Sequence, residues 1–212
     1  MTILNTIKIW NWKRRNRLYH HLNALQQIST DINGFQLSKQ ARLQYDAMDY
    51  VYGEIDNIAF AALLSLVQTN NDTVFYDLGS GSGKTVMLYA MLFPQQKSCG
   101  IELFDTLHQA ALIQKRRLGC LPDYQDIASK ITYIQDNFLN VDLNDATVIY
   151  INSTSYFGDT WTILNHKLSA LPNCTTIITT SKPLITPTYK VAKITRVQMS
   201  WGIVHAYIHV KG

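Results

Sequence analysis

The 212-residue sequence predicts an α/β fold with a mostly parallel central sheet that ends in an antiparallel hairpin. From residue 74 onward, short apolar runs rich in β-branched residues alternate with helical stretches, the pattern of strand–helix–strand units. The last two runs instead alternate apolar and polar residues around Trp201-Gly202, which is typical of a hairpin. A hydrophobic fraction of 47% suits a globular protein.

The individual elements follow from the same pattern. Helices are expected at the start of the chain, around a turn at Asp31–Gly34, and before the first strand: Ile7–Gln27, Lys39–Asp49 and Ile58–Val67. The later helices are Lys84–Phe93, Asp105–Gly119 and Asp159–Ala170. The strands are Val74–Leu78, Ser98–Leu103, Ile131–Gln135, Thr147–Ile151 and Thr175–Thr180, and the hairpin is Tyr189–Gln198 with Ile203–Lys211. We therefore expect a helical segment, 1–49, and an α/β domain, 50–212.

The net charge of +4 is unevenly distributed. Residues 1–45 carry seven basic side chains and one acidic one, whereas the remainder carries 12 basic and 14 acidic side chains. The basic run Lys13–Arg17 lies among Trp10, Trp12 and Tyr19, which makes it a candidate site for nucleic acid or an acidic protein surface. A solvated helix face is the alternative interpretation.

Neither cysteines nor histidines indicate a metal centre. Cys99, Cys120 and Cys174 stand far apart, and the six histidines lack metal-ligand spacing. The apolar stretch Ile58–Val67 is too short to cross a bilayer, and at the N-terminus apolar residues precede basic ones, the reverse of a secretory signal. We expect a monomeric cytoplasmic protein without a metal or a membrane partner; export to another compartment or a host cell stays open.

A glycine-rich loop joins the first strand to the following helix at Asp77–Thr85. A nucleoside-triphosphate loop needs a glycine where Leu78 stands. It also needs a magnesium-binding acid at the end of a later strand, but the strand Thr147–Ile151 is followed by Asn152. A dinucleotide loop needs its third glycine where Lys84 stands. The remaining pattern is typical of loops that bind S-adenosylmethionine, and its members are Asp77, Gly79, Gly81 and Gly83.

A carboxylate at the end of the second strand supports this interpretation. Glu102 follows Gly100-Ile101, at the position where other Rossmann-like folds bind both ribose hydroxyls. Asp77 is expected to hold the positively charged end of the cofactor. An ordinary glycine-rich turn with a surface glutamate is the alternative.

Four segments resemble the disruptor-of-telomeric-silencing family, the histone lysine methyltransferases that lack a SET domain. They are Val51–Glu54, Asp77–Lys84 with Gly100–Glu102, Val148–Asn152 with Tyr156–Gly158, and Ser181–Pro183 with Ser200–Gly202. The resemblance implies a Rossmann-like class I methyltransferase fold, S-adenosyl-L-methionine as cofactor and a protein lysine as methyl acceptor. It also implies that Tyr52 and Glu54 close over the cofactor, for which a capped start of the next helix is the alternative. Lys84, at the end of the loop, is a further cofactor-binding candidate.

The chain departs from the family pattern at two places. The family has an acidic residue directly before a phenylalanine, facing adenine, but here the run is Asp136-Asn137-Phe138. Because a shift of one residue reverses the face of a strand, Asn137 is expected to bond adenine and Phe138 to stack on it. Asp136 is kept as a third candidate for binding the cofactor. In the terminal hairpin, Ala206-Tyr207 replaces a pair of tyrosines.

Methyl transfer to an amine needs in-line positioning and a neutral nucleophile. We expect Asn152, at a strand end, to accept a hydrogen bond from the lysine amine, although a turn-forming role is the alternative. The channel is expected to be walled by aromatic side chains, for each of which core packing is the alternative: Tyr156, Phe157, Trp201 and Tyr207.

Two other functions stay open from the sequence. The first is a methyltransferase for a nucleic-acid base or a small-molecule amine, although Ser153-Thr154 replaces the Pro-Pro-aromatic element of the adenine-modifying type. The second is a non-catalytic cofactor-binding interaction module. Turnover separates the second function from the others.

Overall fold

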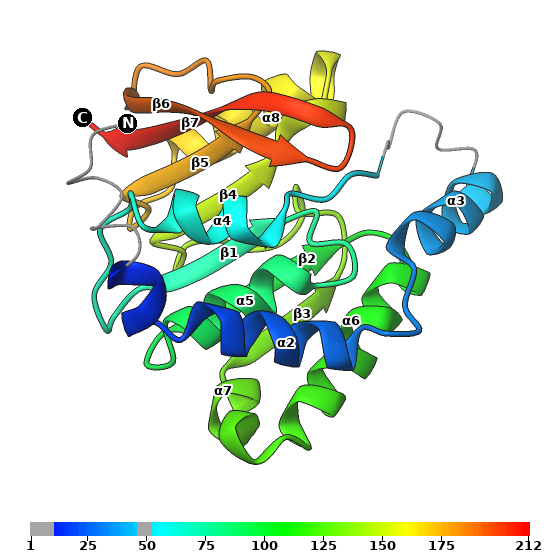
Figure 1. Ribbon diagram of the computed structural model, residues 1–212. Coiled ribbons are helices and arrows are strands. Elements are labelled where there is room, and N and C mark those ends of the chain that lie inside the picture. Colours follow the sequence, from blue (N-terminus) through cyan, green and yellow to red (C-terminus); the bar gives the residue numbers. More distant parts are fainter. Residues whose placement is uncertain (1–10, 46–51) are drawn as a thin grey trace.

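A computed structural model describes residues 11–45 and 52–212 (Figure 1). Its seven-stranded sheet has the order β3-β2-β1-β4-β5-β7-β6. The parallel strands are β1 (Val74–Leu78), β2 (Lys97–Glu102), β3 (Ile131–Gln135), β4 (Val148–Asn152) and β5 (Thr176–Thr180). The hairpin is β6 (Tyr189–Met199) and β7 (Gly202–Lys211), and β7 is antiparallel to both of its neighbours. The predicted fold is confirmed, and every strand ends within one residue of its expected bounds.

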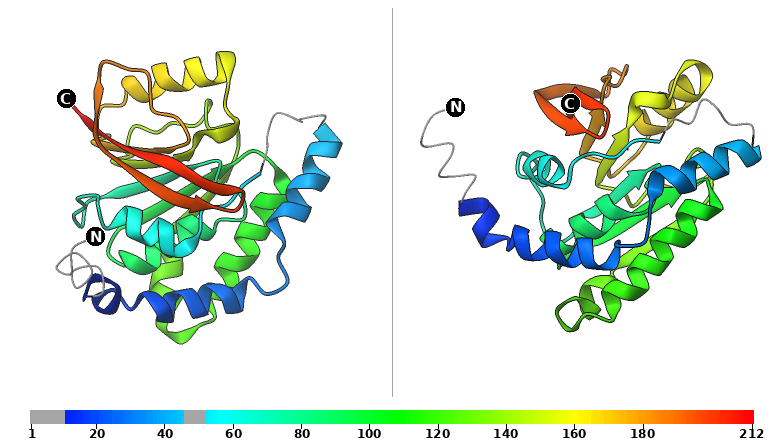
Figure 2. Two further views of the ribbon diagram at one scale, coloured as in Figure 1. Left: turned by 45° about the horizontal axis from the view of Figure 1, so that its top comes forward. Right: turned by 45° about the vertical axis from the view of Figure 1, so that its right-hand side comes forward.

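Helices cover both faces of the sheet (Figures 1 and 2). One face carries α4 (Asn57–Leu64), α5 (Lys84–Leu92), α6 (Asp105–Gly119) and α7 (Gln125–Ser129), and the other carries α8 (Gly158–Ser169). The strand order explains this division, because right-handed crossovers that run in opposite directions place their helices on opposite faces. On β1, the side chain of Phe75 accordingly packs in the α5 core, and that of Tyr76 packs in the α8 core.

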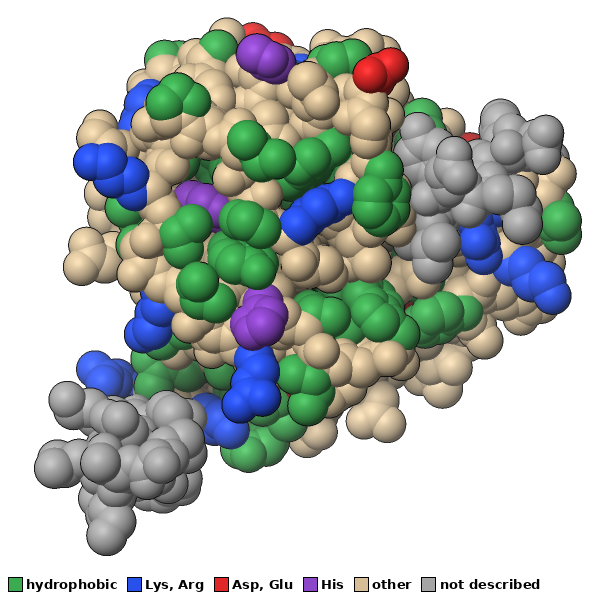
Figure 3. Space-filling view, turned by 90° about the horizontal axis from the view of Figure 1, so that it is seen from above, with side chains coloured by type: hydrophobic (Ala, Val, Ile, Leu, Met, Phe, Trp, Pro, Cys, Tyr) green, Lys and Arg blue, Asp and Glu red, His purple; other side chains and the backbone are tan. Residues whose placement is uncertain are grey.

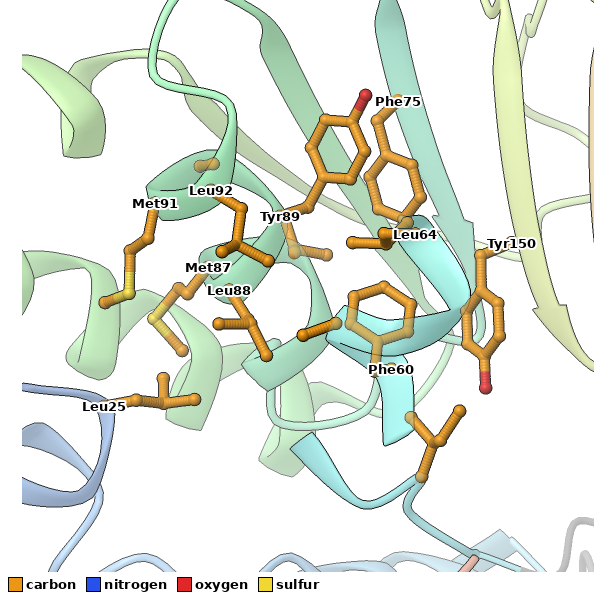
Figure 4. Packing of buried hydrophobic residues seen from close by; sticks show 14 of the residues in the cluster. Leu25, Phe60, Leu64, Phe75, Met87, Leu88, Tyr89, Met91, Leu92 and Tyr150 are labelled. Carbon is orange, nitrogen blue, oxygen red and sulfur yellow. The ribbon is translucent and has the colours of Figure 1, made fainter. Parts of the chain in front are cut away.

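The N-terminal segment packs against the α5 side of the sheet. In α2 (Leu18–Ile28), Leu18 and Leu25 are fully buried, and Leu25 lies beside Met87 and Leu88 of α5 (Figure 4). His21 Nδ1 lies 2.9 Å from the Tyr124 hydroxyl, and burial lowers the pKa of His21 to about 4. The described part of this segment therefore shares one hydrophobic core with the α/β domain.

Two helix predictions need correction. The helix expected over Ile7–Gln27 is interrupted, because Arg17 adopts a left-handed backbone with φ 48° and α2 begins only at Leu18. Residues 11–15 are helical, and 7–10 lie outside the described residues. The second helix, α3 (Gly34–Tyr45), begins earlier than Lys39, and 46–49 lie outside the described residues.

The basic run Lys13–Arg17 lies at the start of the described chain. Arg17 forms an exposed ion pair of 3.4 Å with Asp123, and pairs of this kind stabilise a protein little. Within 11–45 and 52–212, no helix has the length and apolar character that crossing a membrane requires. The same residues hold no cluster of three metal-ligating side chains.

Candidate active site

A cavity of about 1120 Å³, including its open mouth, lies at the carboxyl ends of β1, β2 and β4. This edge of a parallel sheet, where the strand order reverses, is where open α/β folds bind ligands. Most of the predicted site residues line it: Tyr52, Glu54, Asp77, Gly79, Gly81, Lys84, Glu102, Asn137, Phe138, Asn152 and Tyr156. Five predicted residues do not line it: Gly83, Asp136, Phe157, Trp201 and Tyr207.

The glycine loop forms its wall with bare backbone. Gly79 and Gly81 have φ values of 83° and 55°, in the left-handed region that favours glycine. A Cβ at Gly81 would lie 2.7 Å from Cε2 of Tyr52, and one at Gly79 would lie 2.5 Å from the hydroxyl of Tyr156. Gly83 lies behind the wall, where its carbonyl accepts a 2.8 Å hydrogen bond from Tyr133. Any side chain at Gly79 or Gly81 would therefore collide with a residue that lines the cavity.

Glu102 is buried at the end of β2 and joins the loop to α6. Its Oε2 accepts a 2.7 Å hydrogen bond from the Gly81 amide, and its Oε1 accepts one of 2.9 Å from the Phe104 amide. Burial raises the pKa of Glu102, and these amides oppose the rise. Since a carboxylate offers about four lone pairs, Glu102 can still accept two hydrogen bonds from a ligand.

Asp77 is a second buried carboxyl group on the same wall. Burial and, to a smaller extent, the charge of Glu102 raise its pKa to about 7, although a hydrogen bond from the Thr85 hydroxyl opposes the rise. Thr85 also lines the cavity. With two carboxyl groups buried together, this end of the cavity favours a positively charged ligand.

The segment before α4 is fastened to the glycine-loop helix. The Tyr52 hydroxyl donates to Glu54 Oε1 at 2.7 Å, and Lys84 Nζ donates to both Glu54 oxygens at 3.0 Å. The cap of α4 is a different residue, Asp56, whose Oδ1 accepts from the Ala59 amide. Tyr52 and Glu54 therefore close over the loop and do not cap the helix, which removes the alternative that the sequence left open.

Asn152 ends β4 and faces the cavity, but its hydrogen bonds differ from the expectation. Its Nδ2 donates to the Gly53 carbonyl at 3.1 Å, and its Oδ1 accepts from the hydroxyls of Thr154 and Thr180, each at 2.9 Å. An amide oxygen has two lone pairs, so in this arrangement both acceptor positions are filled. Asn152 ties β4 to the closing segment and offers no free acceptor to an amine.

Of the four aromatic side chains expected to wall the channel, one, Tyr156, lines the cavity in this structure. Tyr156 lines the cavity and meets Phe138 edge-to-face, with ring centroids 5.2 Å apart. Phe157 is 70% exposed and lies under the Lys182 ammonium, 3.8 Å from its ring centroid. Trp201 packs over Gly53, outside the cavity lining.

Tyr207 lies on the opposite face of the sheet from the one that was expected. Its neighbour Ala206 pairs with Thr180 and is fully buried in the core shared with α4 and α5. Successive side chains point to opposite faces, so Tyr207 points to the other face, away from the cavity.

The three residues Asp136, Asn137 and Phe138, which follow β3, do not all face the cavity. Asn137 and Phe138 line the cavity, and Phe138 is buried. Asp136 is exposed, and its Oδ1 accepts a 2.6 Å hydrogen bond from the Asn137 amide. Asp136 therefore shapes the turn and does not face the ligand.

Tyr150 is a cavity residue that the sequence analysis missed. It is 2% exposed, and among the described residues its hydroxyl has no hydrogen-bond partner. Burial and the nearby charge of Asp77 raise the pKa of Tyr150 well above its ordinary value. The neighbouring Thr180 hydroxyl opposes this rise but donates its own hydrogen to Asn152. The spacing of two residues from Asn152 was the available signal, because such residues share one face of a strand.

The model of the family described as histone methylation protein DOT1 matches residues 37–207. The chain belongs to this DOT1 family. A protein-lysine N-methyltransferase of Saccharolobus islandicus is 28% identical over 87 residues, which are 41% of this chain and 50% of that protein. The chain thus spans about half the length of this curated relative.

Solved methyltransferases share the fold of this DOT1-family chain. TrmN from Thermus thermophilus has a TM-score of 0.60 and 15% identity over 81% of this chain and 53% of that one. An RNA methyltransferase from Salinibacter ruber, in complex with S-adenosyl-L-homocysteine, has a TM-score of 0.56 and 18% identity over 72% and 90% of the two chains. Magnesium protoporphyrin IX methyltransferase from Synechocystis, with bound S-adenosylmethionine, has a TM-score of 0.56 and 11% identity over 90% of this chain and 91% of that one. With the family match, these neighbours confirm the predicted Rossmann-like methyltransferase fold, and they are consistent with S-adenosylmethionine as the cofactor.

Proposed function

We propose that this DOT1-family chain transfers a methyl group from S-adenosylmethionine to the side-chain amine of a protein lysine. The observation that carries the proposal is the joining of two functional surfaces in one cavity. The glycine loop with Asp77 and Glu102 forms one wall, and the end of β4 with Tyr150 and Asn152 forms another. The lysine methyltransferase relative supports the choice of acceptor.

The residues of the first wall fit the cofactor. Glu102 has two acceptor positions for the ribose hydroxyls, and Asn137 and Phe138 lie where the base would be bonded and stacked. Asp77 would face the cationic methionine end, and the bare backbone of Gly79 and Gly81 leaves room for it. When bound, the sulfonium supplies an electrophilic methyl group, and its sulfur keeps the electron pair of the broken carbon–sulfur bond.

The residues of the second wall suit an uncharged amine. Desolvation disfavours a lysine ammonium, so an acceptor lysine loses its proton to solvent as it enters the cavity. The Tyr150 hydroxyl has no partner among the described residues and is available to bind the uncharged amine, whereas Asn152 is engaged by Gly53, Thr154 and Thr180. We assign Tyr150 to orienting the amine, and Asn152 to holding the wall in place.

The test is incubation with radiolabelled S-adenosylmethionine and three acceptors: lysine peptides, mixed RNA, and histones. Label in methyl-lysine after acid hydrolysis is the expected result, and Glu102→Gln should abolish it. Label in RNA alone would overturn the proposal in favour of a base methyltransferase. Tight binding of S-adenosylhomocysteine without any turnover would instead indicate a non-catalytic module.

A further inference from the structure

The β6–β7 hairpin turns one face away from the core. Its inward side chains include Val197, Met199 and Ala206, which belong to the buried cluster. The alternate positions pair across the two strands, Ile194 with Tyr207, Arg196 with His205, and Gln198 with Ile203. Because side chains alternate between faces, these residues and Val191, which pairs with His209, form the opposite surface. The outer hairpin face is defined here by Val191, Ile194, Arg196, Ile203, His205 and Tyr207.

This face exposes aliphatic side chains. Ile203 is 66% exposed, Ile194 56% and Val191 43%. In the view from above, hydrophobic and basic side chains mingle over the surface, whereas acidic ones lie at its margin (Figure 3). A cluster of exposed apolar side chains with a polar surround is typical of a protein-interaction site.

The carboxy-terminal stretch that contains the face carries basic charge only. From residue 160 to the last residue the chain contains no aspartate or glutamate, and its basic side chains are Lys167, Lys182, Lys190, Lys193, Arg196 and Lys211. The charge of the whole segment after residue 45 is slightly negative, because 14 of the 15 acidic residues of the chain lie between 46 and 159. A basic surface attracts and orients an acidic partner.

The outer hairpin face is continuous with the mouth of the cavity. At the hairpin turn, the Ser200 amide donates to the Glu54 carbonyl at 2.8 Å, and Met199 bridges to Ile55, both next to cavity-lining residues. At β7, the Ser181 amide donates to the His205 carbonyl at 2.8 Å. A segment of about six extended residues, roughly 20 Å long, reaches from Ile194 to the turn.

We propose that the outer hairpin face docks an acidic segment of the substrate protein that also carries aliphatic residues, and so delivers a nearby lysine to the cavity. The proposal rests on lysine methylation as the proposed function. A protein fits better than a nucleic acid, because the exposed aliphatic side chains of Val191, Ile194 and Ile203 separate the cations. The rings of His205 and Tyr207 on the same face are the surface on which a base could stack, and the oligonucleotide probe tests that outcome.

The experiment uses the full chain and three fluorescent probes. The first is a peptide with one lysine among leucines and aspartates, the second has asparagines in place of the aspartates, and the third is a single-stranded oligonucleotide. The triple variant I194S/I203S/R196S removes the face. The control I113S/R116S removes an exposed isoleucine and arginine from α6, on another side of the molecule. Anisotropy measures binding, and methyl transfer to both peptides gives KM and kcat.

The acidic peptide should bind the wild type about tenfold more tightly than the neutral one, a difference of about 1.4 kcal/mol. In the face variant this preference should vanish through KM, with kcat and calorimetric S-adenosylhomocysteine binding unchanged; the α6 control should keep it. Equal methylation of both peptides by the wild type would overturn the docking proposal alone. Methylation of neither would overturn lysine methylation, and docking with it. Loss of oligonucleotide binding alone would assign the face to nucleic acid.

Discussion

The two walls of the cavity are held in different ways. At the glycine loop, the wall is backbone: Gly79 and Gly81 are bare, and Glu102 is fixed by two main-chain amides. At β4, the wall is made of side chains held by other side chains, as Asn152 is by Thr154 and Thr180. Adding any side chain to the backbone wall is expected to block the cavity, whereas a substitution in the side-chain wall removes single hydrogen bonds.

The largest effect is expected from Gly81→Ala. The new methyl group would meet Tyr52 at 2.7 Å in a left-handed backbone with φ 55°. The control is Gly158→Ala, which has the same strain at φ 53° but no atom within 4 Å of the added Cβ. Each should cost about 1–2 kcal/mol of unfolding free energy. Only Gly81→Ala should weaken S-adenosylhomocysteine binding, by more than about a hundredfold in calorimetry; equal losses in both variants would mean that strain, not space, matters.

Tyr150→Phe tests the side-chain wall and should lower kcat about tenfold. Its hydroxyl is buried and lacks a partner among the described residues, so its removal should leave the unfolding free energy unchanged or slightly higher. Tyr76→Phe is the control, because it removes a hydroxyl bonded to Asp145 at 2.9 Å outside the cavity. That control should lose stability and keep kcat. Full turnover in Tyr150→Phe would remove this hydroxyl from the mechanism.

Asp77 gives the backbone wall a pH dependence. Its pKa is raised by burial from 3.8 to about 7, so the folded chain keeps a proton that the unfolded chain releases. The stability from this group is complete below about pH 4 and is lost as the pH rises toward 7. Binding has the opposite sign, because only the ionised carboxylate attracts a cation.

Between pH 6 and 8, we therefore expect S-adenosylhomocysteine binding to strengthen about tenfold while thermal stability without ligand declines. Asp77→Asn should flatten both profiles, and Asp145→Asn, outside the cavity, should leave the binding profile as it is. An unaltered binding profile in Asp77→Asn would show that this carboxyl group does not meet the cofactor.

The backbone wall was predictable from the sequence because its determinants are local. Glycines that follow a strand, and an acid at the next strand end, occupy positions that parallel pairing fixes. The side-chain wall was not predictable from the sequence. Tyr207 and Ala206 are adjacent, and only the pairing of Ala206 with Thr180 decides which of the two side chains faces inward. The left-handed backbone at Arg17 was not predictable either, because glycine and asparagine are the residues that favour this conformation and position 17 is an arginine.

Phe157→Ala should have the smallest effect and decides between the channel expected from the sequence and the observed one. The ring is 70% exposed, outside the cavity lining, and covered by the Lys182 ammonium. Its loss should remove an exposed cation–π contact of about 0.5–1 kcal/mol and change kcat on a short lysine peptide by less than about twofold. A tenfold fall in kcat at unchanged thermal stability would instead place this ring against the bound substrate, and the side-chain wall would then be completed only when the acceptor arrives.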